Sequence, residues 1–159
     1  MIAKIEKKEI GCIARFERHL EHSVEEVWSW LTENEKLAQW FNELQVGELR
    51  EGGFMRFDMP DGTVEELEIT ELKKHAVFEF SWWVDSVRFE LAIESNGCKL
   101  VLIERIEKIT DHTPKDLAGW HVCLDVIVAL MDGRTIARME EWKKWFEEYK
   151  QVIGEVTQS

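Results

Sequence analysis

The stretch PKDLAGWHVCLDVIVALM, residues 114–131, decides the fold of this chain. Its apolar side chains recur at steps of three and four, so they line one broad face of a helix. The positions on that face are Leu117, Trp120, Leu124, Ile127 and Met131. Thr113 is placed to cap the helix, and Gly133 to end it in a left-handed turn. The helix would be about 27 Å long at 1.5 Å per residue, so it needs a broad apolar surface to lie on.

The residues before this helix predict that surface. Alternation of apolar and polar side chains, typical of half-buried strands, covers residues 12–20, 44–49, 54–59, 64–72, 76–83, 87–94 and 99–109. Among the predicted turns, Asp61-Gly62 and Asn96-Gly97 are the strongest hairpin signals, and Asp85-Ser86 is another. Successive hairpins predict an antiparallel meander.

Two short helices are predicted between the first strand and the second. Ser23 with Glu26 forms a capping box ahead of the first helix, and Thr32 with Glu35 forms one ahead of the second. A last helix is predicted over residues 136–153. The order of elements is a strand, two short helices, six strands and two long helices, which predicts an α+β domain.

The last predicted helix carries an apolar stripe. Its members are Met139, Trp142, Phe146, Tyr149 and Ile153. The stripe can cover the core of its own chain or pack on a second copy. We favour the first arrangement, because an apolar helix stripe usually covers its own core.

Composition limits the classes of partner. With 20 basic and 32 acidic residues the formal net charge is −12, which repels phosphate, so we expect no nucleic-acid and no membrane partner. The odd number of cysteines, Cys12, Cys98 and Cys123, is typical of free thiols in a reducing compartment. Without an apolar leader or a run long enough to cross a bilayer, the chain is predicted to be cytoplasmic. Its length predicts one domain over residues 1–159.

The sequence shows no enzyme motif. Nucleophile-elbow, phosphate-binding, dinucleotide-binding and zinc-protease patterns are all missing from it. His19 and His22 lie three residues apart, but no further zinc ligands are spaced around them, so two surface histidines are the simpler interpretation. We therefore expect a non-enzymatic protein without metal or cofactor, and rank an enzyme with unidentified catalytic residues last.

Three polar residues interrupt apolar patterns. Arg18 falls on the inner side of the first strand, and Glu104 breaks an apolar strand. Each of the two either orients the polar group of a ligand, forms a buried ion pair, or lies at the end of the sheet. His121 falls opposite the apolar helix face, so we expect it to point away from the sheet, which disfavours a role as general base.

Local strings in a fixed order resemble a known family. They are Arg18 with Leu20, Val27-Trp28, Leu31-Thr32, Trp40-Phe41, Gly52-Gly53-Phe54, Phe80-Ser81-Trp82 and Gly119-Trp120. Together they resemble the stand-alone domain of the activator of heat-shock-protein-90 ATPase homologues, a family of the START / Bet v 1-like (SRPBCC) superfamily. The resemblance implies a helix-grip fold, in which a curved antiparallel sheet wraps around a long C-terminal helix and two short helices lie between strands 1 and 2.

The resemblance also implies a cavity between sheet and helix that suits a hydrophobic or aromatic small molecule. Its contacts would come from Trp40, Phe54, Phe57, Phe80, Trp82, Phe89, Trp120, Leu124 and Ile127. The alternative is a close-packed core without a cavity, because alternation does not distinguish the two. A second function that the resemblance implies is a co-chaperone-type interaction module that stimulates a heat-shock-protein-90-like ATPase.

Overall fold

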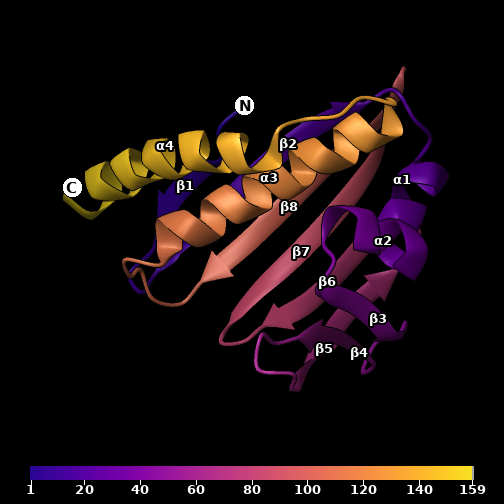
Figure 1. Cartoon of the computed structure of the whole chain (residues 1–159), viewed down its shortest axis with the longest axis horizontal. Helices are drawn as coiled ribbons and strands as arrows, with labels where there is room; N and C mark the ends of the chain where they lie inside the picture. Colours follow the sequence, from indigo (N-terminus) through magenta and orange to yellow (C-terminus); the bar gives the residue numbers. More distant parts are fainter. Residues whose placement is uncertain (159) are drawn as a thin grey trace.

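An antiparallel sheet of eight strands curves around the long helix α3 (Figure 1). The computed structural model describes residues 1–158. The strands are β1 (Lys4–Lys7), β2 (Cys12–Leu20), β3 (Leu44–Glu48), β4 (Phe54–Asp58), β5 (Val64–Lys73), β6 (Val77–Trp82), β7 (Asp85–Glu94) and β8 (Gly97–Ile106). The helices are α1 (Val24–Thr32), α2 (Asn34–Trp40), α3 (Thr113–Met131) and α4 (Arg138–Gln158).

The strand order across the sheet is β1-β2-β8-β7-β6-β5-β4-β3, so the six strands from β3 to β8 form the predicted meander. The predicted α+β arrangement is confirmed, with α1 and α2 inserted between β2 and β3. The N-terminal segment differs from the prediction, because Lys4–Lys7 forms an edge strand of its own. This strand pairs with β2, with Lys4 opposite Arg15.

Helix α3 ends as predicted and begins differently. Gly133 has a φ of +71°, and its N–H donates to the carbonyl of Leu130 at 3.2 Å. The N–H of Arg134 donates to the carbonyl of Ala129 at 2.7 Å, which completes a left-handed helix end. At the start, Thr113 is the first helical residue rather than the cap.

The core lies between the concave face of the sheet and α3. Alternate side chains of each central strand are buried there, because successive residues of a strand point to opposite faces. Examples on β2 and β8 are Cys12, Ala14, Phe16, Leu100 and Leu102. Helices α1 and α2 close one end of the sheet, and α1 begins at the predicted cap Ser23, whose hydroxyl accepts a hydrogen bond from the N–H of Glu26 at 3.1 Å.

Helix α4 lies along the outer side of α3 and reaches β1 (Figure 1). Its side chains Tyr149 and Ile153 are buried, whereas Met139 is 65% exposed. The apolar stripe therefore covers the core of its own chain at its C-terminal end, in agreement with the arrangement that we favoured. Because α4 occupies this position, α3 is buried on both sides.

Three local predictions are wrong. The turn between β6 and β7 is Trp83 and Val84, because Trp82 pairs with Asp85 in the sheet register. Alternation along residues 87–94 predicts that Ile93 shares the inner face with Phe89, but Ile93 is 84% exposed near the end of β7. The Thr32 hydroxyl donates to the Trp28 carbonyl at 2.9 Å within α1, so it does not cap α2.

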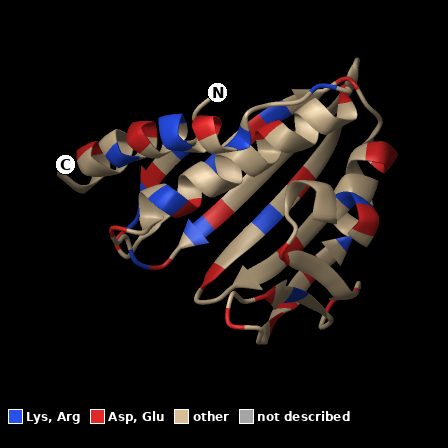
Figure 2. Ribbon diagram, viewed as in Figure 1, with Lys and Arg blue, Asp and Glu red and all other residues tan. Residues whose placement is uncertain are grey.

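Charged residues gather away from the helix that the sheet holds. Figure 2 shows that α3 is mostly uncharged along its length, whereas acidic residues mark α1, α4 and the strands at the β3 edge. Within residues 1–158, no helix combines the length and the apolar character that crossing a bilayer requires.

Candidate functional site

The centre of the sheet–helix interface is filled by side chains. Trp40, Phe80 and Phe89 are at most 1% exposed, and the Trp40 and Phe89 rings meet edge to face with centroids 6.4 Å apart. Leu124 and Ile127 of α3 are fully buried above them. These five predicted contact residues therefore form packed core where the resemblance implied a cavity.

An open hollow lies at one end of this interface, where the β6–β7 hairpin meets the first turn of α3. Its volume is about 490 Å³. Its apolar lining consists of Phe57, Met59, Trp82, Trp83, Val84 and Ile106. We call this hollow the aromatic cleft. A smaller hollow of about 160 Å³ adjoins it and shares Trp82 and Asp116.

Aromatic rings of three elements meet in the aromatic cleft. Trp82 and Trp83 contact each other edge to face, with centroids 4.9 Å apart. Phe57 of β4 lies 5.2 Å from Trp83 and 5.6 Å from Trp82. Trp120 of α3 lies behind Trp82 at 5.1 Å. Such edge-to-face arrangements present both ring faces and ring edges to a ligand.

The backbone at Trp83 is held in an unusual conformation. Trp83 has a φ of +56° at the first position of a two-residue turn, where glycine is the favoured residue. The left-handed region costs an L-residue roughly 1–2 kcal/mol. The turn nevertheless presents Trp83, 44% exposed, and Val84, 79% exposed, at the mouth of the cleft. Conformational strain of this kind is typical of functional positions.

Asp116 and Asp85 line the aromatic cleft on what we call its deep side, and the carboxyl group of Glu104 lies buried next to them. Asp116, in the first turn of α3, accepts a hydrogen bond of 3.2 Å from the indole Nε1 of Trp82. Asp85, at the start of β7, accepts one of 2.9 Å from the N–H of Glu107. Glu104 of β8 is fully buried beside them.

Glu104 is the unusual member of this group. Neither of its carboxyl oxygens has a hydrogen-bond donor among the described residues. Burial raises the pKa of Glu104 well above its usual range, and the nearby carboxyls of Asp116 and Asp85 raise it further.

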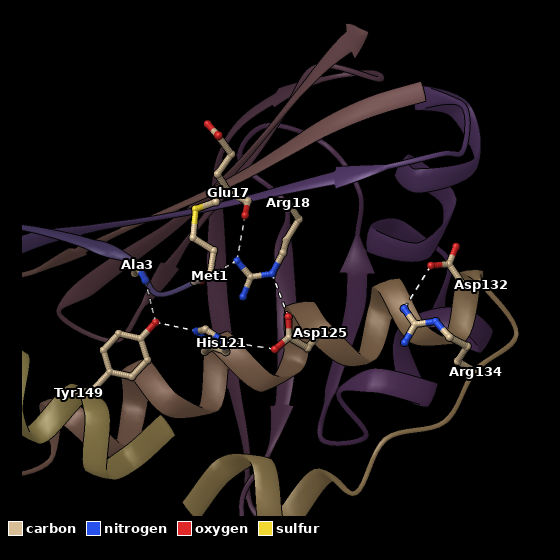
Figure 3. Close-up of polar contacts among 9 residues, drawn as sticks. All are labelled: Met1, Ala3, Glu17, Arg18, His121, Asp125, Asp132, Arg134 and Tyr149. Carbon is tan, nitrogen blue, oxygen red and sulfur yellow. Dashed lines mark hydrogen bonds and ion pairs between the residues drawn. The ribbon is translucent and has the colours of Figure 1, made fainter. Parts of the chain in front are cut away.

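A second polar cluster lies between β2, α3 and α4 (Figure 3). Arg18 donates from Nε to Asp125 Oδ1 at 2.9 Å, so of the three alternatives left open for Arg18 the structure shows the ion pair. His121 lies between Asp125 and Tyr149: its Nε2 is 3.2 Å from Asp125 Oδ2, and its Nδ1 is 2.7 Å from the Tyr149 hydroxyl. The Tyr149 oxygen accepts a hydrogen bond of 3.0 Å from the N–H of Ala3.

His121, which was predicted to point away from the sheet, is buried under α4. It is 0% exposed, because α4 covers this side of α3 and Trp145 stacks on its ring at 3.8 Å. Burial lowers the pKa of His121 despite the opposing charge of Asp125. The neutral ring then accepts the Tyr149 O–H at Nδ1 and keeps its proton on Nε2. Because His121 and Tyr149 are both 0% exposed, we interpret this cluster as a structural clamp between α3 and α4.

Of the four remaining predicted contact residues, three line the aromatic cleft or the smaller hollow and one lies outside both. Phe57 and Trp82 line the aromatic cleft, and Trp120 lines the smaller hollow behind Trp82. The ring of Phe54 packs over Gly47 of β3, where a β-carbon would collide with it. Sequence reasoning therefore found three residues of the site.

Sequence reasoning missed three residues that line the aromatic cleft, Trp83, Asp85 and Asp116, and also Phe41, which lines the smaller hollow. Asp116 was not among the predicted contact residues, and Asp85 was predicted only as part of a turn. A signal for Trp83 was present, since two consecutive tryptophans at the end of a predicted strand exceed what one buried face needs. The two predicted surface histidines pair with carboxylates on separate elements, His19 with Glu94 and His22 with Asp132.

Comparison with known proteins places the chain in a family. The profile of the family described as Activator of Hsp90 ATPase homolog 1-like protein matches residues 21–132, more than half of the chain. This range begins after β2 and ends with α3, so it contains all of the apolar lining of the aromatic cleft. A search of functionally curated proteins finds no match.

Solved structures share the fold over nearly the whole chain. A conserved protein of unknown function from Enterococcus faecalis is 25% identical, with a TM-score of 0.88 over 97% of this chain and 91% of its own. CalU16 from Micromonospora echinospora is 19% identical, with a TM-score of 0.73 over 95% and 96%. A protein from Bordetella parapertussis is 20% identical, with a TM-score of 0.72 over 94% and 91%. The last two likenesses establish the fold alone.

Proposed function

The chain belongs to the family of Activator of Hsp90 ATPase homolog 1-like proteins, and from that membership and the cleft we propose that it binds an aromatic small molecule. The ligand occupies the aromatic cleft rather than the centre of the sheet–helix interface, which side chains fill. We assign no chemical step to the site, so the protein acts as a binding protein and not as an enzyme.

The single observation that carries this proposal is the open hollow of about 490 Å³ lined by Phe57, Trp82 and Trp83. This volume lies within the range of roughly 300–1,000 Å³ that small-molecule sites occupy, and the lining is largely apolar with a few polar groups. An exposed Trp83 beside an exposed Val84 has no role in the core, and such patches mark binding surfaces.

Titration of ¹⁵N-labelled protein with a library of neutral aromatic compounds tests the proposal. We expect saturable shifts of the Trp82 indole N–H and of the Trp83 and Val84 amides. Trp83→Ala should weaken binding, because it removes an exposed ring from the cleft. Trp142→Ala is the matched control, since Trp142 lines a different hollow between α3 and α4.

Two results would remove the proposal. The first is a library in which no compound shifts the cleft signals. The second is binding that Trp83→Ala and Trp142→Ala weaken equally, which would place the ligand elsewhere.

A second candidate function is a co-chaperone-type module that stimulates a heat-shock-protein-90-like ATPase. Two observations favour it: the family match and the net charge of −12, which suits a basic docking face. Exposed carboxylates concentrate on β5 at Glu65, Glu66 and Glu68. Stimulation of the ATPase that becomes weaker as salt is added would support this function. The absence of both stimulation and a complex at low salt would eliminate it.

A further inference from the structure

The aromatic cleft combines aromatic rings with carboxyl groups at its deep side. We propose that it selects aromatic ligands that carry a cationic amine, and that the ammonium group binds at Asp116 in front of the buried Glu104. This inference rests on the proposed function and adds the charge of the ligand to it.

Glu104 provides the observation that points to a ligand. It lies on the inner face of β8, between Ala14 of β2 and Val87 of β7 in the sheet register, and is 0% exposed. Neither oxygen has a donor among the described residues. A native core rarely leaves a carboxyl without partners, since a hydrocarbon side chain would fill the same space at lower cost. The carboxyl oxygens of Glu104 lack hydrogen-bond donors, and an ammonium group supplies donors.

Asp116 connects Glu104 to the cleft. Its carboxyl group lies next to Glu104 and also lines both hollows. One of its oxygens accepts the Trp82 N–H at 3.2 Å, which orients the group toward the aromatic rings. Asp85, on the other wall of the cleft, contributes a third carboxyl. A ligand that enters along the rings therefore meets carboxyl oxygens at its inner end.

The basic side chains of the cleft do not neutralise these groups. Lys108 and His112 line the cleft but are exposed at its rim, and neither forms an ion pair among the described residues. Arg138 lines the smaller hollow, but its guanidinium donates to the Trp40 carbonyl at 2.8 Å. The unbalanced charge at the deep side is negative.

The surrounding rings suit an organic cation better than a metal ion. The ring faces of Trp82 and Trp83 carry partial negative charge, and this charge attracts an ammonium group. Within residues 1–158, no cluster of three or more side chains is arranged to hold a metal. An amine on an aromatic scaffold matches both features of the cleft.

Binding of a cation has a proton-linked consequence. The groups that face Glu104 are Asp116 on α3, Asp85 on β7 and Cys12 on β2, and each opposes its ionisation. An ammonium ion beside Asp116 favours ionised Glu104, so binding should release a proton from its carboxyl group.

A matched series of ligands tests the inference. Tryptamine, tryptophol and indole-3-propionate share one ring system and differ in the charge of the side chain. We expect tryptamine to bind with a Kd about tenfold lower than that of tryptophol, as a charge-assisted hydrogen bond allows. Indole-3-propionate should bind most weakly. Calorimetry in two buffers of different ionisation enthalpy should show proton release for tryptamine alone.

Two variants assign the preference to residues. Asp116→Asn retains an oxygen for the Trp82 N–H, and should bring the Kd of tryptamine close to that of tryptophol. Asp111→Asn is the matched control: it removes the same charge near the start of α3 from an exposed residue that lies outside the aromatic cleft. Glu104→Gln should abolish the proton release that accompanies tryptamine binding.

The outcomes separate this inference from the proposed function. If tryptophol and indole-3-propionate shift the cleft signals as strongly as tryptamine, the cleft binds aromatic ligands without regard to charge, and the cation preference is wrong. The same conclusion follows if Asp116→Asn and Asp111→Asn act alike. If no member of the series and no compound of the neutral library shifts these signals, both the inference and the proposed function are wrong.

Discussion

The carboxyl group of Asp116 accepts a hydrogen bond of 3.2 Å from the indole N–H of Trp82. This bond joins the first turn of α3 to the end of β6, and the same two residues separate the aromatic cleft from the smaller hollow. This contact therefore links one end of the sheet–helix interface to the shape of the aromatic cleft.

Replacement of Trp82 by Phe should loosen this end of the helix. The variant keeps an aromatic ring but loses the N–H donor, so we expect a loss of about 1 kcal/mol in the free energy of unfolding. Amide hydrogen exchange in residues 113–119 should accelerate. Trp142→Phe, on α4, is the control and should leave this exchange unchanged. Equal exchange in both variants would show that the bond does not hold the helix.

Replacement of Trp83 by Gly should separate stability from binding. Glycine relieves the positive φ of +56°, which offsets part of the packing that the half-exposed ring loses. We therefore expect a change of about 1 kcal/mol or less in the free energy of unfolding, together with a large loss of ligand affinity. Urea denaturation and ligand titration measure the two quantities. A severe loss of stability would identify Trp83 as a core residue instead.

Glu104 should make the protein less stable as pH rises. Its pKa is raised in the folded state by burial, whereas the unfolded chain releases the proton near the ordinary value of 4.5. Between these two values the folded state binds more protons than the unfolded state, so the free energy of unfolding falls with pH. The slope for one proton is at most about 1.4 kcal/mol per pH unit.

Urea denaturation of the wild type and of Glu104→Gln between about pH 5 and 8 measures this effect. The stability of the variant relative to the wild type should increase with pH, because the amide cannot ionise. Glu107→Gln is the control, because Glu107 is exposed and directly follows β8, the strand that carries Glu104. Parallel curves for the wild type and Glu104→Gln would contradict the assignment of a raised pKa.

Tyr149 should resist ionisation until the protein unfolds. It is the only tyrosine of the chain, so tyrosinate absorbance at 295 nm reports it alone. Burial raises its pKa above the ordinary value of 10.0. We expect no tyrosinate signal from the folded protein at about pH 11, and a normal titration in denaturant. Early ionisation would mean that α4 does not cover this side of α3.

Local patterns predicted most of the fold. The apolar face of α3, the Gly133 helix end and the alternation along the central strands follow from rules that act within a few residues. The β6–β7 turn was misplaced by two residues, because its positive φ falls on Trp83 and not on a glycine. The burial of His121 was not predicted, because α4, which covers it, is a distant segment of the chain.

The site was predictable only in part, for a similar reason. Phe57, Trp82 and Trp120 belong to regular patterns, and the pairing of distant elements brings them together. Alternation gave no indication that the centre of the interface is filled and its end is open, since this depends on the summed volume of side chains. Asp116 and Glu104 lie on two consecutive elements, α3 and β8, and only the packing of the helix on the sheet places them side by side.

Fluorine NMR of protein labelled with 5-fluorotryptophan tests the central claim most directly. Each of the eight tryptophans contributes one resonance, which single Trp→Phe variants assign. On titration with the aromatic library, we expect the Trp82 and Trp83 resonances to shift together and to saturate, while Trp142 stays unchanged. Shifts confined to Trp142, or no saturable shift at Trp82 and Trp83 with any compound, would contradict binding in the aromatic cleft.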